Sequence, residues 1–433
     1  MYRLSVPVLV ICSGVVLCAQ TAPLRLTLDD AVARGLAVNH RISEVGARIE
    51  AARAVEDQRK AADRPLVDLL GGYSRTNHVQ EFGIPGGRII YPDIPNNVRS
   101  RIDFQWPIYT GGRTSALTRA AVAEVNALSQ DQNTVRADLK LEITRAYWAV
   151  ITANASVDVL NQALARVGAH LNDVRNQLNV GLVPPSDVLT VEAQQARQRG
   201  LLIEAQNVAA NAAIEFRSIV GLPPDTPFEL SDRLDAPPAL PDDAAALVAA
   251  ARASRPERKA LEIRMDEAAA HIAAASAGKL PTVATIGGYD VARPNPKIFP
   301  REAGWKPSWD AGVSASWNVF DGGRVRAEIA EASATRLAAE ERLKDFDVNL
   351  EADVRQRLGD LGAARASITA AEAGVTSATE ARRVIEDRFG AGVATNSDVI
   401  DAESSLLQAE LDRTRSLADA HLAAARLDRA IGR

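Results

Sequence analysis

Cysteine and long apolar runs are both scarce in this chain of 433 residues. Its only two cysteines, Cys12 and Cys18, lie close to the N-terminus, so the rest of the chain has no disulfide and no thiolate metal site. Beyond that N-terminal segment no run of about 18 apolar residues occurs, which excludes a membrane-spanning helix. A chain of this kind could still cross a membrane as strands.

Residues 1–19 have the pattern of an export signal, with one basic residue before a short apolar run. Cleavage after Ala19 fits this pattern. In the alternative, Cys18 is the lipid-modified N-terminus of a lipoprotein, although Leu17 stands where a small residue would be expected. We therefore expect an exported protein.

Strong charge of either sign is absent as well. The net charge is −5 and about −6 without the leader, which argues against nucleic acid as a partner. No nucleophile elbow, nucleotide fingerprint or metal cluster occurs, so nothing supports an enzyme or a cofactor. The 5 histidines lack the paired spacing of metal ligands and are His40, His78, His170, His271 and His421.

Proline is missing from two long stretches, residues 108–183 and 308–433, which predicts very long helices. A helix from about Arg113 to Leu178 would be roughly 100 Å long, which suits an aqueous compartment rather than a compact core. The spacing of a coiled-coil seam runs through Leu160, Leu164, Val167, Leu171, Val174 and Leu178. Its equivalents are Ala371, Val375, Ala378, Arg382, Ile385 and Phe389, with one charged interruption.

The chain carries the same pattern twice, since residues 100–113 return 211 positions later as residues 311–324. We expect a first repeat over residues 20–220, an extended proline-rich linker outside the helices over 221–243, and a second repeat over 244–433. Each repeat predicts a helix, a strand, a long loop, a second strand, a very long helix, a tight turn and a last helix. The expected shorter helices are Thr27–Ala62, Ala244–Ala253 and Pro256–Ala277.

Aromatic residues make up only 4% of the chain, and 12 of them lie in residues 65–110 and 281–320. The expected strands are Leu66–Arg75 and Val98–Tyr109, with a second-copy strand that alternates from Trp309 to Val319. Val98–Tyr109 has Ile102, Phe104, Trp106 and Ile108 on one face, opposite Arg101, Asp103 and Gln105. Alternation with clustered aromatics favours lipid-facing strands, whereas a small aromatic core packed on helices is the alternative.

Four strands per chain cannot close a barrel, because the smallest single-chain barrels have about eight. Unpaired strand edges in lipid would cost several kcal/mol per group. Either the strands lie outside a membrane or several chains pool them, and two or three chains both remain open on length alone.

The duplicated halves, the strand pairs between helices and the segments 179–188 and 392–401 resemble the TolC-type outer-membrane efflux channels. The resemblance covers essentially the whole mature chain. It implies a mostly α-helical homotrimer in which a twelve-stranded membrane β-barrel continues into a twelve-helix α-barrel. Such a channel crosses the outer membrane of a Gram-negative-type bacterium, with its helices in the periplasm. Its partners would be outer-membrane lipid, a periplasmic adaptor and an inner-membrane pump.

The same resemblance implies that Asp398 and Asp401 ring the periplasmic entrance, with Asp187 as the repeat counterpart of Asp398. Six carboxylates around a narrow axis would attract cations. Helix capping is the alternative for Asp398 and Asp187, but not for Asp401. Two positions depart from the family pattern: Ala394 replaces a latching arginine and Phe389 replaces a tyrosine.

Two glycine-containing turns are expected at the far ends of the helices. The predicted adaptor contacts there are Val180, Gly181, Leu182, Gly392 and Val393. The glycines also suit the left-handed backbone of a tight turn, so turn geometry is the alternative reading. Thr110-Gly111-Gly112-Arg113 and Asp321-Gly322-Gly323-Arg324 predict strand-to-helix hinges capped by Thr110 and Asp321, because they lack the end of a phosphate loop.

A second class of protein fits the long heptad helices, namely a periplasmic coiled-coil adaptor or other interaction protein. An adaptor would have one helical hairpin and flanking small β domains. This chain predicts two hairpins and aromatic strand pairs, so the leading hypothesis is a passive exit duct of a tripartite efflux or type I secretion system.

Overall fold

The computed structural model describes residues 23–235, 238–241 and 243–433. The expected leader, residues 1–19, lies outside the described residues. The chain forms two compact units. One, here the turn unit, comprises the described parts of Met1–Val38, Glu142–Pro237 and Arg365–Leu422; the other, here the sheet unit, comprises Asn39–Leu141, Pro238–Ala364 and Ala423–Arg433. No helix in the described part of the chain is long and apolar enough to cross a membrane.

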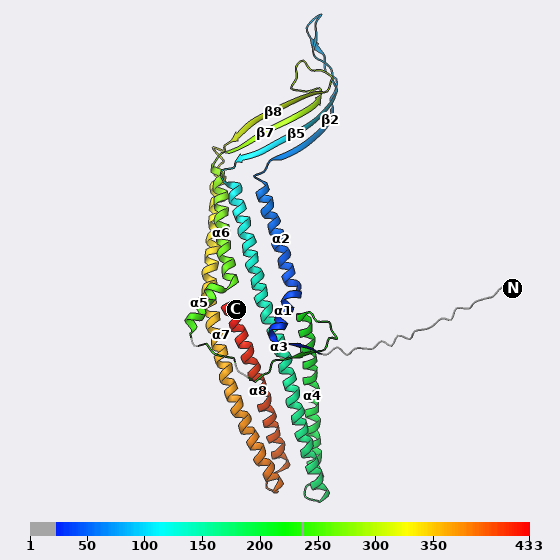
Figure 1. The fold of residues 1–433 in the computed structure, drawn as a ribbon, viewed down its shortest axis with the longest axis vertical. Helices are drawn as coiled ribbons and strands as arrows, with labels where there is room; N and C mark the ends of the chain where they lie inside the picture. The colour runs from blue at the N-terminus through cyan, green and yellow to red at the C-terminus, as the bar shows by residue number, and fades with distance from the viewer. Residues whose placement is uncertain (1–22, 236–237, 242) are drawn as a thin grey trace, which may run out of the picture. The chain divides into compact units, whose positions relative to one another are not determined.

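The sheet unit contains one four-stranded antiparallel sheet in the order β2-β5-β7-β8, visible side by side in Figure 1. Its strands are β2 (Leu66–Arg75), β5 (Asn96–Tyr109), β7 (Thr282–Arg293) and β8 (Lys306–Ser316). Both first-copy strand predictions are confirmed, β5 beginning two residues early. Two short strands, β3 (Phe82–Gly83) and β4 (Ile89–Tyr91), pair within the expected loop after β2.

The second-copy strand is shorter than predicted. The expected alternation continued to Val319, but β8 ends at Ser316, opposite Thr282 at the start of β7. Residues beyond Ser316 therefore have no partner on β7. The Trp317 indole instead donates to the Lys279 carbonyl at 3.1 Å, just as the repeat-equivalent Trp106 donates to Asp63 at 3.1 Å.

The helices repeat with the predicted offset. Both α3 (Arg113–Asn179) and α7 (Arg324–Gly390) have 67 residues, and both α4 (Pro185–Val220) and α8 (Asn396–Ile431) have 36. The remaining helices are α5 (Ala244–Ser254), α6 (Pro256–Ser276) and a 3₁₀ turn at Ala277–Lys279. Four residues of the predicted seam, Leu160, Val167, Leu171 and Val174, are buried, as close packing of α3 requires.

The single helix predicted over Thr27–Ala62 is wrong. The structure has α1 (Leu28–Val38) and α2 (His40–Ala61), separated at Asn39, whose side chain accepts the Arg41 N–H at 2.9 Å and so caps α2. Thr27 caps α1, since its hydroxyl accepts the Asp30 N–H at 3.2 Å.

The proline-rich linker also differs from expectation, because it is not extended outside the packed structure throughout. Its residues Phe228–Leu230 form β6, which pairs in parallel with β1 (Leu24–Leu26). Nearby, the buried Tyr147 hydroxyl donates to the Asp232 carboxylate at 2.6 Å. Burial and this carboxylate raise the pKa of Tyr147, so the phenol stays protonated and fixes the linker to α3.

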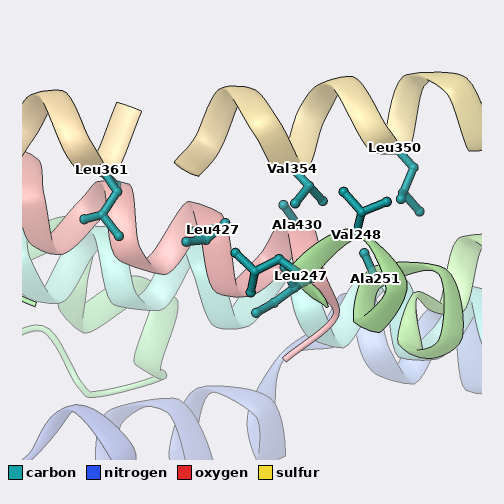
Figure 2. Close-up of a cluster of buried hydrophobic side chains, with 10 residues drawn as sticks. Leu247, Val248, Ala251, Leu350, Val354, Leu361, Leu427 and Ala430 are labelled. Carbon is teal, nitrogen blue, oxygen red and sulfur yellow. The ribbon is translucent and has the colours of Figure 1, made fainter. Parts of the chain in front are cut away.

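A hydrophobic core forms where the short helix α5 meets two of the long helices. In the sheet unit, α5 supplies Leu247, Val248 and Ala251, α7 supplies Leu350, Val354 and Leu361, and α8 supplies Leu427, Ala430 and Ile431. Figure 2 shows side chains of this cluster pointing toward one another between the three helices. Burial of this kind, rather than a single central core, stabilises the long helices.

Candidate functional site: the two helix turns

The turns that join α3 to α4 and α7 to α8 have the same backbone geometry. Gly181 and Gly392 have φ of +76° and +75°. The Gly181 N–H donates to Leu178 and the Leu182 N–H to Gln177, both at 2.9 Å. The second turn repeats this pattern, which is a Schellman motif, and it explains the position of both glycines.

Replacing Gly181 or Gly392 with alanine is expected to destabilise the helical region by about 1 kcal/mol, the penalty for alanine in a left-handed conformation. Strain rather than collision would be the cause, since a Cβ at either glycine meets nothing within 4 Å. The measurement is the thermal midpoint of the helical circular dichroism signal.

Gly374→Ala is the matched control, because Gly374 lies inside α7 with equally open surroundings. Alanine there should raise the midpoint through its helix propensity. Shifts of the same sign at all three glycines would contradict the role of the turn conformation.

The apolar residues expected to contact an adaptor are strongly exposed. Val180, Leu182 and Val393 are 70%, 75% and 66% accessible. In contrast, Val183 and Phe389 are partly buried in one cluster with residues of α3 and α4. The two hairpin ends are thus packed together, while their outermost side chains are left without a partner among the described residues.

Asp398 caps α8. Its carboxylate accepts the N–H and the hydroxyl of Thr395 at 2.7 and 2.8 Å, and the Asp398 N–H donates back to that hydroxyl at 3.3 Å. The hydrogen bonds from Thr395 lower the pKa of Asp398, so its negative charge persists below neutral pH. Asp398 therefore has the helix-capping role given above as the alternative. Its side chain is also exposed and carries a negative charge, so capping does not exclude a role at the entrance.

Asp401 lies three residues further along the same face of α8. It is exposed, and its carboxylate has no hydrogen-bond or ion-pair partner among the described residues. Asp187 is half-buried beside Ser186 at the start of α4, and its carbonyl accepts a hydrogen bond from Asn396 at 3.2 Å. The structure therefore brings Asp187 close to α8.

A buried ion-pair network between α3, α7 and α8 was missed by sequence reasoning. The Glu403 side chain is 2% exposed and accepts from Arg166 Nε at 3.0 Å and from Arg382 Nε at 2.5 Å. Arg166 also pairs with Glu410 at 2.8 Å, and Arg382 with Glu386 at 2.5 Å. The charged interruption of the heptad seam at Arg382 was the available signal.

A second polar link joins the same hairpins closer to the turns. His170 Nε2 on α3 lies 2.7 Å from Asn396 Oδ1 at the start of α8. The His170 ring also meets the edge of Phe389, with centroids 5.2 Å apart. Phe389, which replaces the tyrosine of the family pattern, thus makes an apolar contact with His170. Polar contacts of His170 and Glu403 join the α3–α4 hairpin to the α7–α8 hairpin.

A pair of glycines precedes each of the two long helices α3 and α7. Gly111, Gly112, Gly322 and Gly323 all have positive φ. The Asp321 carboxylate accepts the N–H groups of Gly323 and Val325, both at 2.9 Å, which confirms its capping role. Thr110 accepts more weakly from the Thr114 N–H at 3.5 Å.

Comparison with known proteins gives one consistent result. The family model described as outer membrane efflux protein matches residues 32–222 and 247–433. Protein CyaE of Bordetella pertussis is 28% identical over 388 residues, 89% of this chain and 79% of that protein. Outer membrane protein TolC of Vibrio cholerae is 25% identical over 389 residues, 90% of this chain and 86% of that protein.

The fold agrees with these matches. The solved structure of the outer-membrane channel OprN has a TM-score of 0.78 at 21% identity, covering 94% of this chain and 89% of that one. The resemblance drawn from the repeated halves and the helix turns is confirmed, and the chain belongs to the outer membrane efflux protein family.

Proposed function

We propose that three copies of this chain assemble into one passive duct that opens when an adaptor and a pump bind its periplasmic helix turns. Family membership makes the chain an outer-membrane efflux channel; the proposal concerns how copies assemble and which residues control passage. The main support is the four-stranded sheet: among the described residues, its outer strands β2 and β8 each pair with a neighbouring strand on one side only.

Strand pairing supports a shared wall. A strand edge in lipid has unsatisfied N–H and C=O groups, each costing several kcal/mol. If β8 of one copy pairs with β2 of the next, every edge is removed. Three copies would supply twelve strands and twelve long helices, the latter from α3, α4, α7 and α8.

The two faces of the sheet differ in polarity, which indicates the face that would contact lipid and the face that would line the pore. The side chains of Ile102, Trp106, Trp309 and Val313 are exposed and apolar, and they alternate along β5 and β8 with charged or small residues. We assign the apolar face to lipid and the face with Arg101, Asp290 and Asp310 to the pore. The helix turns then lie in the periplasm, with Asp398, Asp401 and Asp187 at the entrance.

The number of copies in a detergent-extracted particle tests this proposal. We expect light scattering, corrected for detergent, to give the mass of three chains, and the particle to survive mild heating in dodecyl sulfate. A stable particle containing a single chain would contradict the shared wall. An adaptor-like protein would instead purify as a soluble species without detergent.

The exposed Val180 and Leu182, two residues apart on one turn, and Val393 on the other support the turns as the adaptor contact. Exposed apolar side chains that lie close together suit a small apolar interface. The entrance acids favour cations over anions through their charge, whichever compound passes.

A further inference from the structure

The segment that joins β7 to β8, residues 294–305, folds back onto one face of the sheet and is here called the strap. Lys297 on the strap lies with Nζ 3.1 Å from Asp290 Oδ2 on β7, and it also pairs with Asp310 on β8. Figure 1 draws this connection at the end of the sheet away from the helices. Both carboxylates lie on the face that carries Arg101.

The beginning of the strap is fixed by Asn295, which is buried. Its amide nitrogen donates to the Lys306 carbonyl at 2.8 Å and to the Ser308 hydroxyl at 2.9 Å. Its carbonyl oxygen accepts the Lys297 N–H at 2.9 Å. Lys297 is therefore held where its side chain reaches back over β7 and β8.

The carboxylates that bind Lys297 are also held in place by arginines of the sheet. Asp290 is 2% exposed and accepts from Arg99 Nε at 2.6 Å, while Arg101 donates to Asp103 at 2.6 Å and to Asp310 at 2.9 Å. Arg101 reaches Asp310 by crossing β7 at Gly288, where a Cβ would collide with its guanidinium group.

The charge of Lys297 explains why the strap is held against the sheet. Arg99 and Arg101 face three carboxylates, those of Asp103, Asp290 and Asp310. Lys297 supplies a third cation to this group of acids. Lifting the strap would take this partner from the buried Asp290, which would keep only Arg99 and Arg101, and from the partly exposed Asp310, which would keep only Arg101. Removing a partner from a buried carboxylate is unfavourable.

The strap is also joined to the loop between β2 and β5. Arg301 donates to the Tyr91 hydroxyl at 2.7 Å and lies over its ring, with Cζ 5.0 Å from the centroid. Arg88 pairs with Glu302 at 2.5 Å. The two loops at this end of the sheet are therefore linked by a hydrogen bond, a cation–π contact and an ion pair.

We propose that the strap narrows the outer end of the pore and that Lys297 holds it in place as an electrostatic clasp. The inference rests on the proposed duct, in which the face with Asp290 and Asp310 lines the pore. Large cargo would pass only after the Lys297 contacts open.

Site-directed labelling tests the clasp, since residues 20–433 contain no native cysteine. Ser314→Cys places a thiol on β8, on the same face as Asp310 and beyond Gly312 toward the helices. A small charged methanethiosulfonate and a polymer-linked maleimide are added to intact cells. Lys297→Met should speed the reaction of the polymer reagent by about tenfold, the effect of ~1.4 kcal/mol, and leave that of the small reagent unchanged.

Two variants serve as controls. Lys297→Arg keeps the charge and should label close to the parent rate. Lys344→Met removes an exposed lysine of α7 that pairs with Glu340 and Glu341, neither of them on the strap, and should also label close to the parent rate. Equal polymer labelling in all variants would overturn the clasp while leaving the duct intact. If neither reagent reacts in any variant although the heat-stable trimer forms, the face does not line a pore, and both proposals fail.

Discussion

Glu403→Gln is expected to lower the free energy of unfolding of the helical region by about 3–5 kcal/mol, the usual cost of removing one member of a buried ion pair. Arg166 and Arg382 would lose their shared partner, and both are largely buried. The measurement is the shift of the urea midpoint of the helical signal at unchanged slope. Protease cleavage near the turns should also increase, because the hairpins would separate more often.

Two comparisons identify the cause. Glu380→Gln removes an exposed pair with Arg383 on α7, where the expected cost is below about 1 kcal/mol. Replacing Glu403 with leucine, Glu410 with glutamine, and both Arg166 and Arg382 with methionine removes the buried charges and leaves only the more exposed Glu386. This variant should recover most of the stability. A Glu403→Gln variant as stable as the Glu380→Gln variant would show that the network does not hold the hairpins together.

Asp398→Asn/Asp401→Asn is expected to reduce the cation preference of the channel strongly, since only Asp187 stays charged at the entrance, and to weaken block by a trivalent cation by about tenfold or more. An ion ~8 Å from a carboxylate gains about 0.5 kcal/mol per unit charge even at the dielectric constant of water, and six carboxylates act together in the proposed trimer. Reversal potentials and block in planar bilayers measure both effects.

Asparagine is chosen at position 398 because it removes the charge but keeps the oxygen that caps α8. The asparagine side chain that replaces Asp398 in this variant would still accept the Thr395 hydrogen bonds, so the helix start should survive. The matched control is Asp225→Asn/Asp235→Asn, which removes two exposed charges from the linker. Cation preference that is unchanged in the first variant, or falls equally in the second, would rule out the entrance ring.

The pKa of Asp398 sets the direction of the pH effect. Because hydrogen bonds from Thr395 lower this pKa from 3.8, the carboxylate is charged above that value. The capping contribution is therefore present above the unfolded pKa and is lost as the pH falls through the lower folded value. Cation preference should accordingly persist at mildly acidic pH.

Regular elements were predictable because their signals are local. The start of Leu66–Arg75 after Pro65, the start of α3 after Gly112 and the turn at Gly181 all depend on residues that set the backbone directly. The break at Asn39 was missed because α1 and α2 form one continuous alanine-rich pattern. Its second-copy equivalent between α5 and α6 is marked by Pro256, so comparison of the repeats would have found it.

Long-range pairings were not predictable for a different reason. Phe228–Leu230 becomes a strand only because Leu24–Leu26 lies beside it, and Glu403 becomes buried only when α3, α7 and α8 meet. The spacing of apolar residues along the chain does not indicate which distant segments come into contact. Asp398, Asp401 and Asp187 were chosen from the family resemblance, and their role at an entrance stays a prediction.

The equal lengths of α3 and α7, and of α4 and α8, have a consequence for any binding partner. Three chains would present six hairpin ends of matched reach, so a docking protein would encounter a near-sixfold rather than a threefold surface. Alternate ends would still differ in their side chains, since Val180 and Leu182 correspond to the smaller Ala391 and Val393. A partner ring could therefore dock with two distinguishable kinds of subunit contact.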